Sequence, residues 1–138
     1  MVMGHAKKLT ILGLLASASL FGRCAKTEPI ICNLNTHHCS CDRHNLLGGT
    51  CTEYTGIEQT QLTGQCTDGT PSTTAMCVQK NRVGTCQVNL KSNKDKVDYE
   101  HYYSPLYSAS TAETFCNAGG TLGTIFTLGQ LEWKWLPE

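Results

Sequence analysis

Alternating apolar and polar positions mark four stretches of the chain as β-strands. Residues 50–55 are rich in Thr and Tyr, and residues 83–90 form a similar run. Apolar or aromatic residues recur at every second position in residues 97–103 and again in residues 130–136. Because the side chains of a strand point alternately to two faces, this period predicts half-buried strands. The second and third runs should pair as a hairpin across the Lys91–Lys96 turn.

Two short helices are expected beside these strands. Ser110-Thr111-Ala112-Glu113 has the pattern of a capping box, and it predicts a helix over residues 111–117 that ends at Gly119. A weaker helical pattern covers residues 58–66, where Gly64 interrupts it. Strands and short helices in a chain of this size predict one small α+β domain, which we place at residues 41–138.

The chain contains a degenerate internal repeat. Gly49-Thr50-Cys51 returns as Gly84-Thr85-Cys86, and each copy is preceded by a Cys and followed by another Cys with a Gly three residues beyond it. Self-similarity of this kind is typical of a duplicated supersecondary unit. We therefore expect two degenerate units of a β-hairpin and a short helix, at about residues 41–76 and 77–121, followed by the C-terminal strand at 130–136.

Nine cysteines divide into one near the N-terminus and an even set of eight. Large aliphatic residues are sparse beyond residue 35, and small exported domains with thin cores are typically held by disulfides. The eight expected disulfide cysteines are Cys32, Cys39, Cys41, Cys51, Cys66, Cys77, Cys86 and Cys116.

Many pairings are open to eight cysteines. The repeat suggests that Cys51–Cys66 and Cys86–Cys116 are equivalent bridges from strand to helix. The remaining four, Cys32, Cys39, Cys41 and Cys77, would then pair among themselves. A bond between Cys39 and Cys41 is disfavoured, since a single residue between them strains the bridge.

Residues 1–23 have the pattern of a signal peptide. Lys7 and Lys8 precede an uncharged apolar run over residues 9–22, which is too short for a stable membrane span. Cys24 follows directly, which favours cleavage before it and lipid attachment to its thiol. Against this, Arg23 is a bulky cation where lipoprotein precursors carry a small residue. The alternative is cleavage after the Ala16-Ser17-Ala18 pattern, which leaves Cys24 as a ninth thiol. Residues 24–40 would form a tether and a loop rich in Cys and His.

The motifs resemble a set of small cysteine-rich bacterial secreted proteins and lipoproteins. Their modules read G-x-C-T-E-Y-T-G, then R-V-G-T-C, a Tyr-Tyr pair and an A-x-x-x-C-x-x-x-G helix. Here these are Gly49–Gly56, Arg82–Cys86, Tyr102-Tyr103 and Ala112–Gly120. The resemblance covers roughly residues 41–121. It implies an exported chain of this topology and implies no activity.

Charge and motif content exclude several classes of function. From Cys24 onward, eight Lys and Arg residues face eleven Asp and Glu residues, a net charge of about −3. Nucleic-acid binding needs clustered cations, so no nucleic-acid partner is expected. The chain has no nucleophile elbow, zinc-protease motif, phosphate-binding loop or C-x-x-C pair. We expect neither an enzyme nor a bound cofactor.

Two groups of side chains are candidates for binding. His37, His38 and His44 lie around Cys39 and Cys41, and imidazoles are ligands that Zn²⁺ and Cu²⁺ prefer, although the spacing differs from that of structural zinc sites. The default interpretation of this segment is a solvated loop between disulfides. Exposed tyrosines are good recognition residues, but in a thin core they serve equally well as packing residues. The tyrosines in question are Tyr99, Tyr102, Tyr103 and Tyr107. Trp133 and Trp135 share a face with Leu131, which favours packing for them.

The sequence therefore predicts an exported protein of the bacterial cell envelope, anchored by a lipid on Cys24, at the outer membrane or cell surface. Its role is expected to be structural or the binding of another macromolecule. One alternative is an envelope protein that binds zinc or copper through residues 37–44. Another is a secreted or periplasmic disulfide-rich inhibitor or toxin-like protein.

Overall fold

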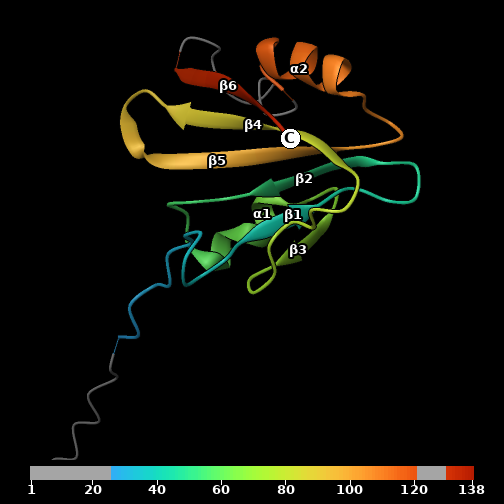
Figure 1. The fold of residues 1–138 in the computed structure, drawn as a ribbon. Helices are drawn as coiled ribbons and strands as arrows, with labels where there is room; N and C mark the ends of the chain where they lie inside the picture. The colour runs from blue at the N-terminus through green and yellow to red at the C-terminus, as the bar shows by residue number, and fades with distance from the viewer. Residues whose placement is uncertain (1–25, 121–129) are drawn as a thin grey trace, which may run out of the picture.

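A computed structural model describes residues 26–120 and 130–138. These residues form one six-stranded antiparallel sheet, in the order β3-β1-β2-β5-β4-β6, with two short α-helices (Figure 1). In chain order the elements are β1 (Ser40–Asp42), β2 (Gly49–Glu53), the 3-10 turn η1 (Gln59–Gln61), α1 (Leu62–Gln65), β3 (Thr70–Ser72), β4 (Arg82–Leu90), β5 (Asn93–Tyr103), α2 (Ala109–Asn117) and β6 (Leu131–Pro137).

The expected strands are all present. β2, β4, β5 and β6 match the four alternating runs, and β4 and β5 form the expected hairpin. The fold is therefore a small, disulfide-rich α+β domain. The sequence did not reveal β1 and β3, which are three residues each and too short for a period to be visible. β1 begins at Ser40, the last residue of the segment expected to be a tether and loop, and continues to Asp42.

Both helices form where the sequence places them, although the cap of α2 differs. α2 begins at Ala109 because Ser108 caps it: the Ser108 hydroxyl accepts the N–H of Thr111, and the Thr111 hydroxyl accepts the N–H of Ser108. The expectation of a cap at Ser110 is therefore wrong by two residues. The helical stretch expected over residues 58–66 forms as the 3-10 turn η1 followed by α1, which is only one turn long.

The helices cover the two ends of one face of the sheet. α1 contacts β1 and β3, while α2 contacts β4 and β6. Beneath α1 lies a cluster of Cys32, Cys39, Cys41, Tyr54, Ile57, Leu62 and Cys66. Beneath α2 lies a second cluster of Cys86, Val88, Tyr102, Ala112, Cys116 and Leu131, with Trp133 and Trp135 packed against it. Cystines thus supply much of the buried apolar volume.

Four disulfides join the eight expected cysteines: Cys32–Cys39, Cys41–Cys66, Cys51–Cys77 and Cys86–Cys116. The predicted Cys86–Cys116 bridge is confirmed, and the predicted Cys51–Cys66 bridge is wrong. The reason lies in the register. Cys41 pairs with Thr52 across the two strands, so both side chains point to the face that the helices cover. Cys51 directly precedes Thr52 in β2 and therefore points to the opposite face. Cys66 beside α1 is therefore within reach of Cys41 and out of reach of Cys51.

The segment before β1 packs against the domain. The N–H of Cys32 donates to the carbonyl of Ile57 at 2.7 Å, and Ile31 forms a bridge with Glu58. Cys32 and Cys39 are both buried. This contact lies beyond the C-terminal end of β2, at the opposite end of that strand from the turn that joins β1 to β2.

Candidate functional sites

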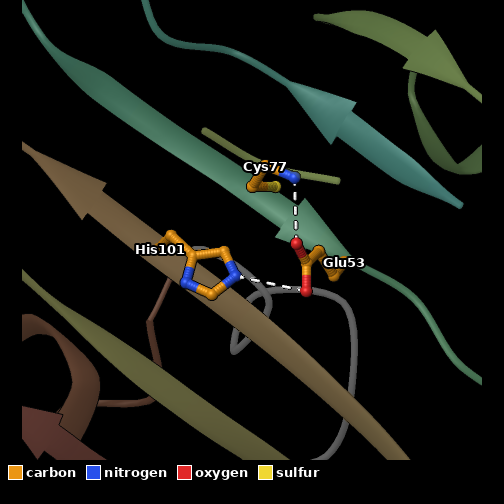
Figure 2. A group of neighbouring side chains, drawn as sticks. All are labelled: Glu53, Cys77 and His101. Atoms are coloured by element: carbon orange, nitrogen blue, oxygen red, sulfur yellow. Dashed lines mark hydrogen bonds and ion pairs between the residues drawn. The ribbon is translucent and has the colours of Figure 1, made fainter. Parts of the chain in front are cut away.

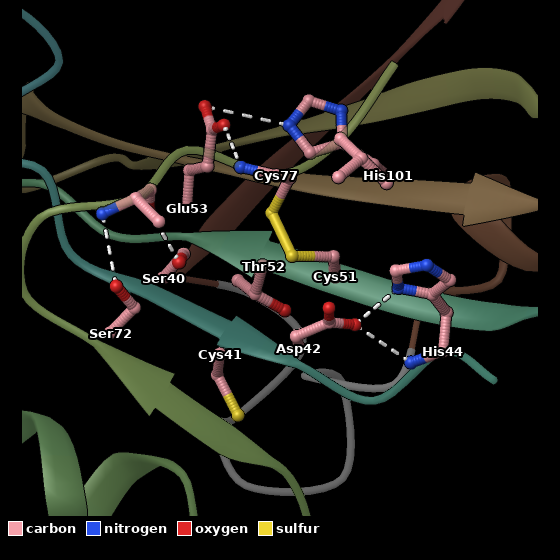
Figure 3. Close-up of a disulfide and its surroundings, with 12 residues drawn as sticks. Ser40, Cys41, Asp42, His44, Cys51, Thr52, Glu53, Ser72, Cys77 and His101 are labelled. Carbon is pink, nitrogen blue, oxygen red and sulfur yellow. Dashed lines mark hydrogen bonds and ion pairs between the residues drawn. A yellow bond between two sulfur atoms is a disulfide. The ribbon is translucent and has the colours of Figure 1, made fainter. Parts of the chain in front are cut away.

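The face of the sheet without helices is crossed by the chain between β3 and β4. This crossing segment, residues 73–81, has no regular secondary structure. It lies over Cys51 and Glu53 of β2 and His101 of β5, which share this face because Cys51 pairs with His101 across the two strands (Figure 3).

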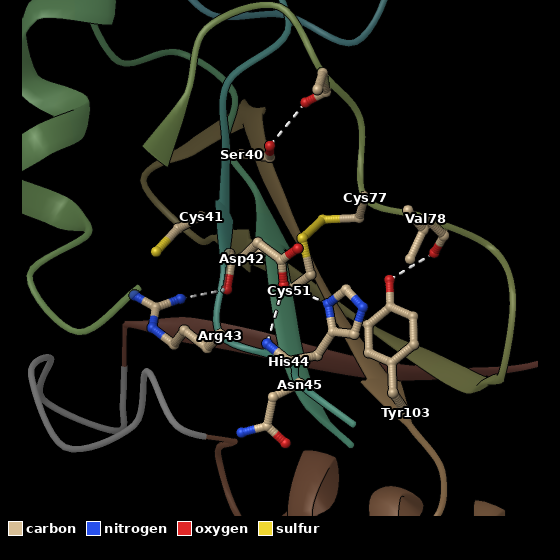
Figure 4. Close-up of polar contacts among 12 residues, drawn as sticks. Ser40, Cys41, Asp42, Arg43, His44, Asn45, Cys51, Cys77, Val78 and Tyr103 are labelled. Carbon is tan, nitrogen blue, oxygen red and sulfur yellow. Dashed lines mark hydrogen bonds and ion pairs between the residues drawn. A yellow bond between two sulfur atoms is a disulfide. The ribbon is translucent and has the colours of Figure 1, made fainter. Parts of the chain in front are cut away.

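Side chains of the sheet hold the crossing segment in place. The Cys51–Cys77 disulfide joins it covalently to β2, with a Cα–Cα distance of 5.9 Å. The Ser40 hydroxyl donates to the carbonyl of Ala75 at 2.7 Å, and the Tyr103 hydroxyl donates to the carbonyl of Val78 at 2.6 Å (Figure 4). These contacts bury a polar cluster under an irregular piece of chain.

That cluster consists of Glu53, Cys77 and His101 (Figure 2). The Glu53 carboxylate accepts the backbone N–H of Cys77 at 2.9 Å through Oε1, and its Oε2 lies 3.5 Å from Nε2 of His101. One ligand atom from each residue can be chosen so that all three lie within 4.8 Å of one another. Among the described residues, this is the one group of three side chains of the types that bind metals.

The second nitrogen of His101 faces Thr85 and Arg82. Nδ1 lies 2.8 Å from the Thr85 hydroxyl and 3.3 Å from Nη1 of Arg82. A guanidinium can only donate, so Nδ1 accepts and the ring proton resides on Nε2, toward Glu53. Burial raises the pKa of Glu53, but the neighbouring His101 ring, the Cys77 N–H and the charge of Arg82 outweigh it. The pKa of Glu53 therefore lies below its ordinary value, and the cluster holds a carboxylate.

Thr85, His101 and Glu53 follow the order of a hydroxyl–imidazole–carboxylate triad. All three are buried, with Thr85 only 6% exposed. Three cavities on the described part of the surface are lined by other residues. The Thr85 side chain is therefore largely enclosed in the described part of the structure.

The structure does not gather the three histidines singled out in the sequence. His37 is exposed, and His38 is half-buried with Nδ1 enclosed and without a hydrogen bond. His44 pairs through Nδ1 with Asp42, and its ring stacks on Tyr103 with the ring centres 4.6 Å apart (Figure 4). None of the three belongs to the group of potential metal ligands in the described part of the chain.

The four tyrosines differ in burial. Tyr102 and Tyr103 are almost fully buried, whereas Tyr99 and Tyr107 are half-buried. The Tyr102 hydroxyl donates to Glu100 at 2.9 Å, and burial together with that carboxylate raises the pKa of Tyr102. The edge of the Tyr107 ring contacts the Tyr102 ring. Tyr102 and Tyr103 therefore pack inside the domain, and Tyr99 and Tyr107 keep part of their surface exposed.

An exposed apolar surface lies at the end of the sheet where β5 ends. The turn from Asn45 to Gly48 holds Leu46 and Leu47, which are 98% and 73% exposed. Leu106, 62% exposed, lies against this turn, because its Cβ is 2.8 Å from where a side chain on Gly48 would begin. Val78, 48% exposed, completes the group. We call these four residues the apolar end surface.

A cavity of about 670 Å³ opens between parts of this surface. It is lined by Leu46 and Val78 together with His44, Asn45, Lys80, Asn81, Tyr103, Ser104 and Pro105. The sequence patterns did not single out Leu46 or Leu47. Two adjacent leucines before a Gly-Gly turn are the one local signal that could have pointed to an exposed apolar tip.

The remaining site, Cys24, lies outside the described residues, as does the signal-peptide pattern. None of the described helices is long and apolar enough to cross a bilayer. No family model, curated protein or solved structure shows a significant match to this chain.

Proposed function

We propose that this protein is an exported, non-catalytic binding domain that presents the apolar end surface to a protein partner while a lipid on Cys24 tethers it to a membrane. The observation that carries the proposal is the exposure of Leu46, Leu47, Val78 and Leu106 at one end of the sheet, beside a cavity that Leu46 and Val78 line. Scattered exposed apolar residues are ordinary, but a contiguous group around a cavity is typical of a protein interface.

The position of the apolar end surface fits a tethered protein. The chain from residue 26 enters the domain at Ile31 and Cys32, beside Ile57 and Glu58. That contact lies beyond one end of β2, and the Asn45–Gly48 turn lies at the other end (Figure 1). A domain tethered through its N-terminal segment would therefore hold the apolar end surface away from the membrane, where a partner can reach it.

Export is supported by the four disulfides. Disulfides persist in oxidising compartments and are rare in the reducing cytosol, and a domain with thin cores depends on them. Membrane attachment is supported by the position of Cys24 directly after the apolar run. A protein cleaved earlier in the signal would be secreted or periplasmic instead, with the same binding surface.

We also propose that the two halves are copies of one unit. In each half a hairpin is followed by a helix and then by a strand that pairs with the first strand of the hairpin: β1, β2, α1 and β3, then β4, β5, α2 and β6. Cys41–Cys66 and Cys86–Cys116 both join the first hairpin strand to the helical region. The matching elements and bridges make Cys41 the equivalent of Cys86. The Gly-Thr-Cys motifs of the sequence instead match Cys51 to Cys86.

The tether is tested by the intact mass of the mature protein before and after reduction and alkylation. We expect a mass that begins at an acylated Cys24 and eight thiols that react only after reduction. A mass that begins near Ser19 would remove the lipid anchor. Thiols that react before reduction would contradict the closed framework.

The binding surface is tested by photo-crosslinking on intact producing cells, with a crosslinking residue placed at Leu47. We expect a discrete protein adduct that is lost when Leu106→Ser is added. The matched control carries the crosslinker at Ile31, which is also exposed, at 45%, and lies at the opposite end of β2. The same adducts from both positions, or none from Leu47, would contradict the proposal.

A further inference from the structure

We infer that Cys77, His101 and Glu53 form a binding site for Zn²⁺ that exists only while the Cys51–Cys77 disulfide is open. A thiolate, an imidazole and a carboxylate are three of the ligand types that zinc prefers, and three protein ligands with one open position are typical of accessible zinc sites. The ligand atoms already lie within 4.8 Å of one another (Figure 2). This inference is independent of the apolar end surface.

The strongest support is the state of His101. Its side chain is buried, yet Nε2 has no hydrogen-bond partner of good geometry and points at the Glu53 carboxylate 3.5 Å away. A buried polar atom without a partner is rare in native proteins and indicates a strained or functional position. A cation between Nε2 and Oε2 would satisfy both atoms.

The surroundings of His101 also fit a metal ligand. Metal-bound histidines usually hold the other ring nitrogen in a hydrogen bond. Here Nδ1 lies 2.8 Å from the Thr85 hydroxyl, whose oxygen can accept a hydrogen bond from Nδ1 once the ring proton moves from Nε2 to Nδ1. Arg82, whose Nη1 is 3.3 Å from Nδ1, must then turn away, and its Nε is already paired with Glu138.

Charge favours a divalent ion. A Cys77 thiolate and the Glu53 carboxylate together carry two negative charges, which Zn²⁺ neutralises in a buried place. Without a metal, a thiolate beside the carboxylate would be disfavoured by repulsion. Metal binding therefore supplies the charge that lets the reduced cluster remain buried.

The disulfide controls the site because a cystine sulfur is not a thiolate. A dithiol reductant opens it in two steps. One reductant thiolate attacks Sγ of Cys77, the Cys51–Cys77 bond breaks, and Cys51 leaves as a thiolate that takes a proton. The second reductant thiolate then closes the reductant's own disulfide and releases Cys77 as a thiolate, which binds the metal. Two electrons pass from the dithiol to the cystine.

Access favours attack at Cys77. Cys51 is in the central strand β2 and is 1% exposed, whereas Cys77 is 7% exposed and lies in the irregular crossing segment between the exposed Met76 and Val78. Once zinc is bound, it holds the crossing segment to the sheet in place of the disulfide and protects the thiolate from reoxidation. The crossing segment is thus attached to the sheet by the disulfide in the oxidised protein and by zinc in the reduced protein.

The test compares two variants of the full chain, both with Cys24→Ser so that each has a single free thiol. Cys51→Ser leaves Cys77 free with all three ligands present, and Cys77→Ser leaves Cys51 free and removes one ligand. Both lack the same disulfide. Titration with Co²⁺ reports a thiolate ligand by a charge-transfer absorption, and Zn²⁺ affinity follows from competition with a chromogenic chelator.

We expect Cys51→Ser to bind one equivalent of Co²⁺ with the thiolate band and to bind Zn²⁺ at least about tenfold more tightly than Cys77→Ser, since a lost ligand or ligand support weakens metal sites by that much or more. Adding His101→Gln to Cys51→Ser should abolish the band. Equal affinities for the two variants, or a band that survives His101→Gln, would overturn the inference.

A second measurement applies if the variants do not fold. The wild-type protein is reduced briefly with a dithiol, with and without Zn²⁺, then alkylated and mapped by mass spectrometry. We expect Zn²⁺ to slow alkylation of Cys77 about tenfold or more while Cys51 is unaffected. No selective protection of Cys77 would overturn the inference.

Discussion

At the scale of single residues, Asp98 shows how the thin core affects ionisation. It lies beside a small cavity of about 90 Å³ with a largely apolar lining of Tyr54, Ile57, Val88, Leu90 and Leu131 as well as polar residues. Burial raises the pKa of Asp98 to about 6, although the N–H of Thr55 donates to the carboxylate at 2.9 Å and Lys96 is nearby. At neutral pH the Asp98 carboxylate is therefore ionised in the native protein, although burial disfavours its charged form.

Replacing Asp98 with Asn should stabilise the protein at neutral pH. The native state binds the Asp98 proton more tightly than the unfolded state, so the free energy of unfolding falls as the pH rises from about 4 to 6. Asn keeps an acceptor for Thr55 and carries no charge. We expect the free energy of unfolding of Asp98→Asn, relative to that of wild type, to be about 2 kcal/mol higher at pH 7.5 than at pH 4. Urea unfolding at both pH values measures this, and a gain that is the same at both would contradict it.

At the scale of elements, the packing of β6 depends on a glycine in β4. Trp135 crosses over Gly84, and a Cβ built on Gly84 would lie 2.2 Å from the indole ring. Trp133 and Trp135, the only tryptophans of the chain, both lie on β6 and pack against the cluster beneath α2. The indole of Trp135 thus occupies the space that the side chain of any residue other than glycine would need at position 84.

Gly84→Ala should therefore displace β6. We expect a loss of about 1–3 kcal/mol in the free energy of unfolding, the usual cost of overpacking, with a change in tryptophan fluorescence. The control is Gly64→Ala in α1, where an added Cβ meets nothing within 4 Å. That variant should be neutral or gain up to about 1 kcal/mol, because alanine favours a helix. Equal effects of the two substitutions would contradict this account.

The disulfides should differ in their contribution to stability. Cys32–Cys39 closes a sequence separation of 7 residues and Cys86–Cys116 one of 30. A longer loop loses more entropy in the unfolded chain when it is closed. Replacing both cysteines by alanine should cost about 1 kcal/mol more for Cys86–Cys116 than for Cys32–Cys39. Guanidinium unfolding of the two double variants measures the difference, and a larger loss for Cys32–Cys39 would oppose the entropic explanation.

The sequence predicted the elements that repeat a pattern and missed those that depend on contacts. β2, β4, β5 and β6 are long enough for their alternation to be visible. β1 and β3 are three residues long and form only because they pair with each other and with β2. The Cys51–Cys66 pairing failed because a motif match does not say which face of a strand a side chain takes. The Glu53–Cys77–His101 cluster joins three distant parts of the chain, so no local spacing could indicate it.

At the scale of the whole molecule, no disulfide of the described residues joins the part of the chain before residue 80 to the part after it. Three disulfides lie within residues 32–77, and the fourth lies within residues 86–116. The halves meet through the antiparallel pair of β2 and β5 and through contacts such as the Tyr103 hydroxyl to Val78. A cut in the crossing segment after Cys77 thus separates the chain into two parts that no covalent bond connects.

Cleavage with trypsin after the exposed Lys80 tests this organisation. In a variant whose Lys91, Lys94 and Lys96 are replaced by Gln, cleavage should give two fragments on a non-reducing denaturing gel, yet one particle of native size on gel filtration, because β2 and β5 remain paired. In the control, Lys80→Gln, cleavage in the Lys91 turn should release nothing until reductant is added, since Cys86–Cys116 spans that cut. Fragments that stay joined after the Lys80 cut would mean that a disulfide crosses between the halves, and the pairing of Cys77 with Cys51, on which the metal site depends, would then be wrong.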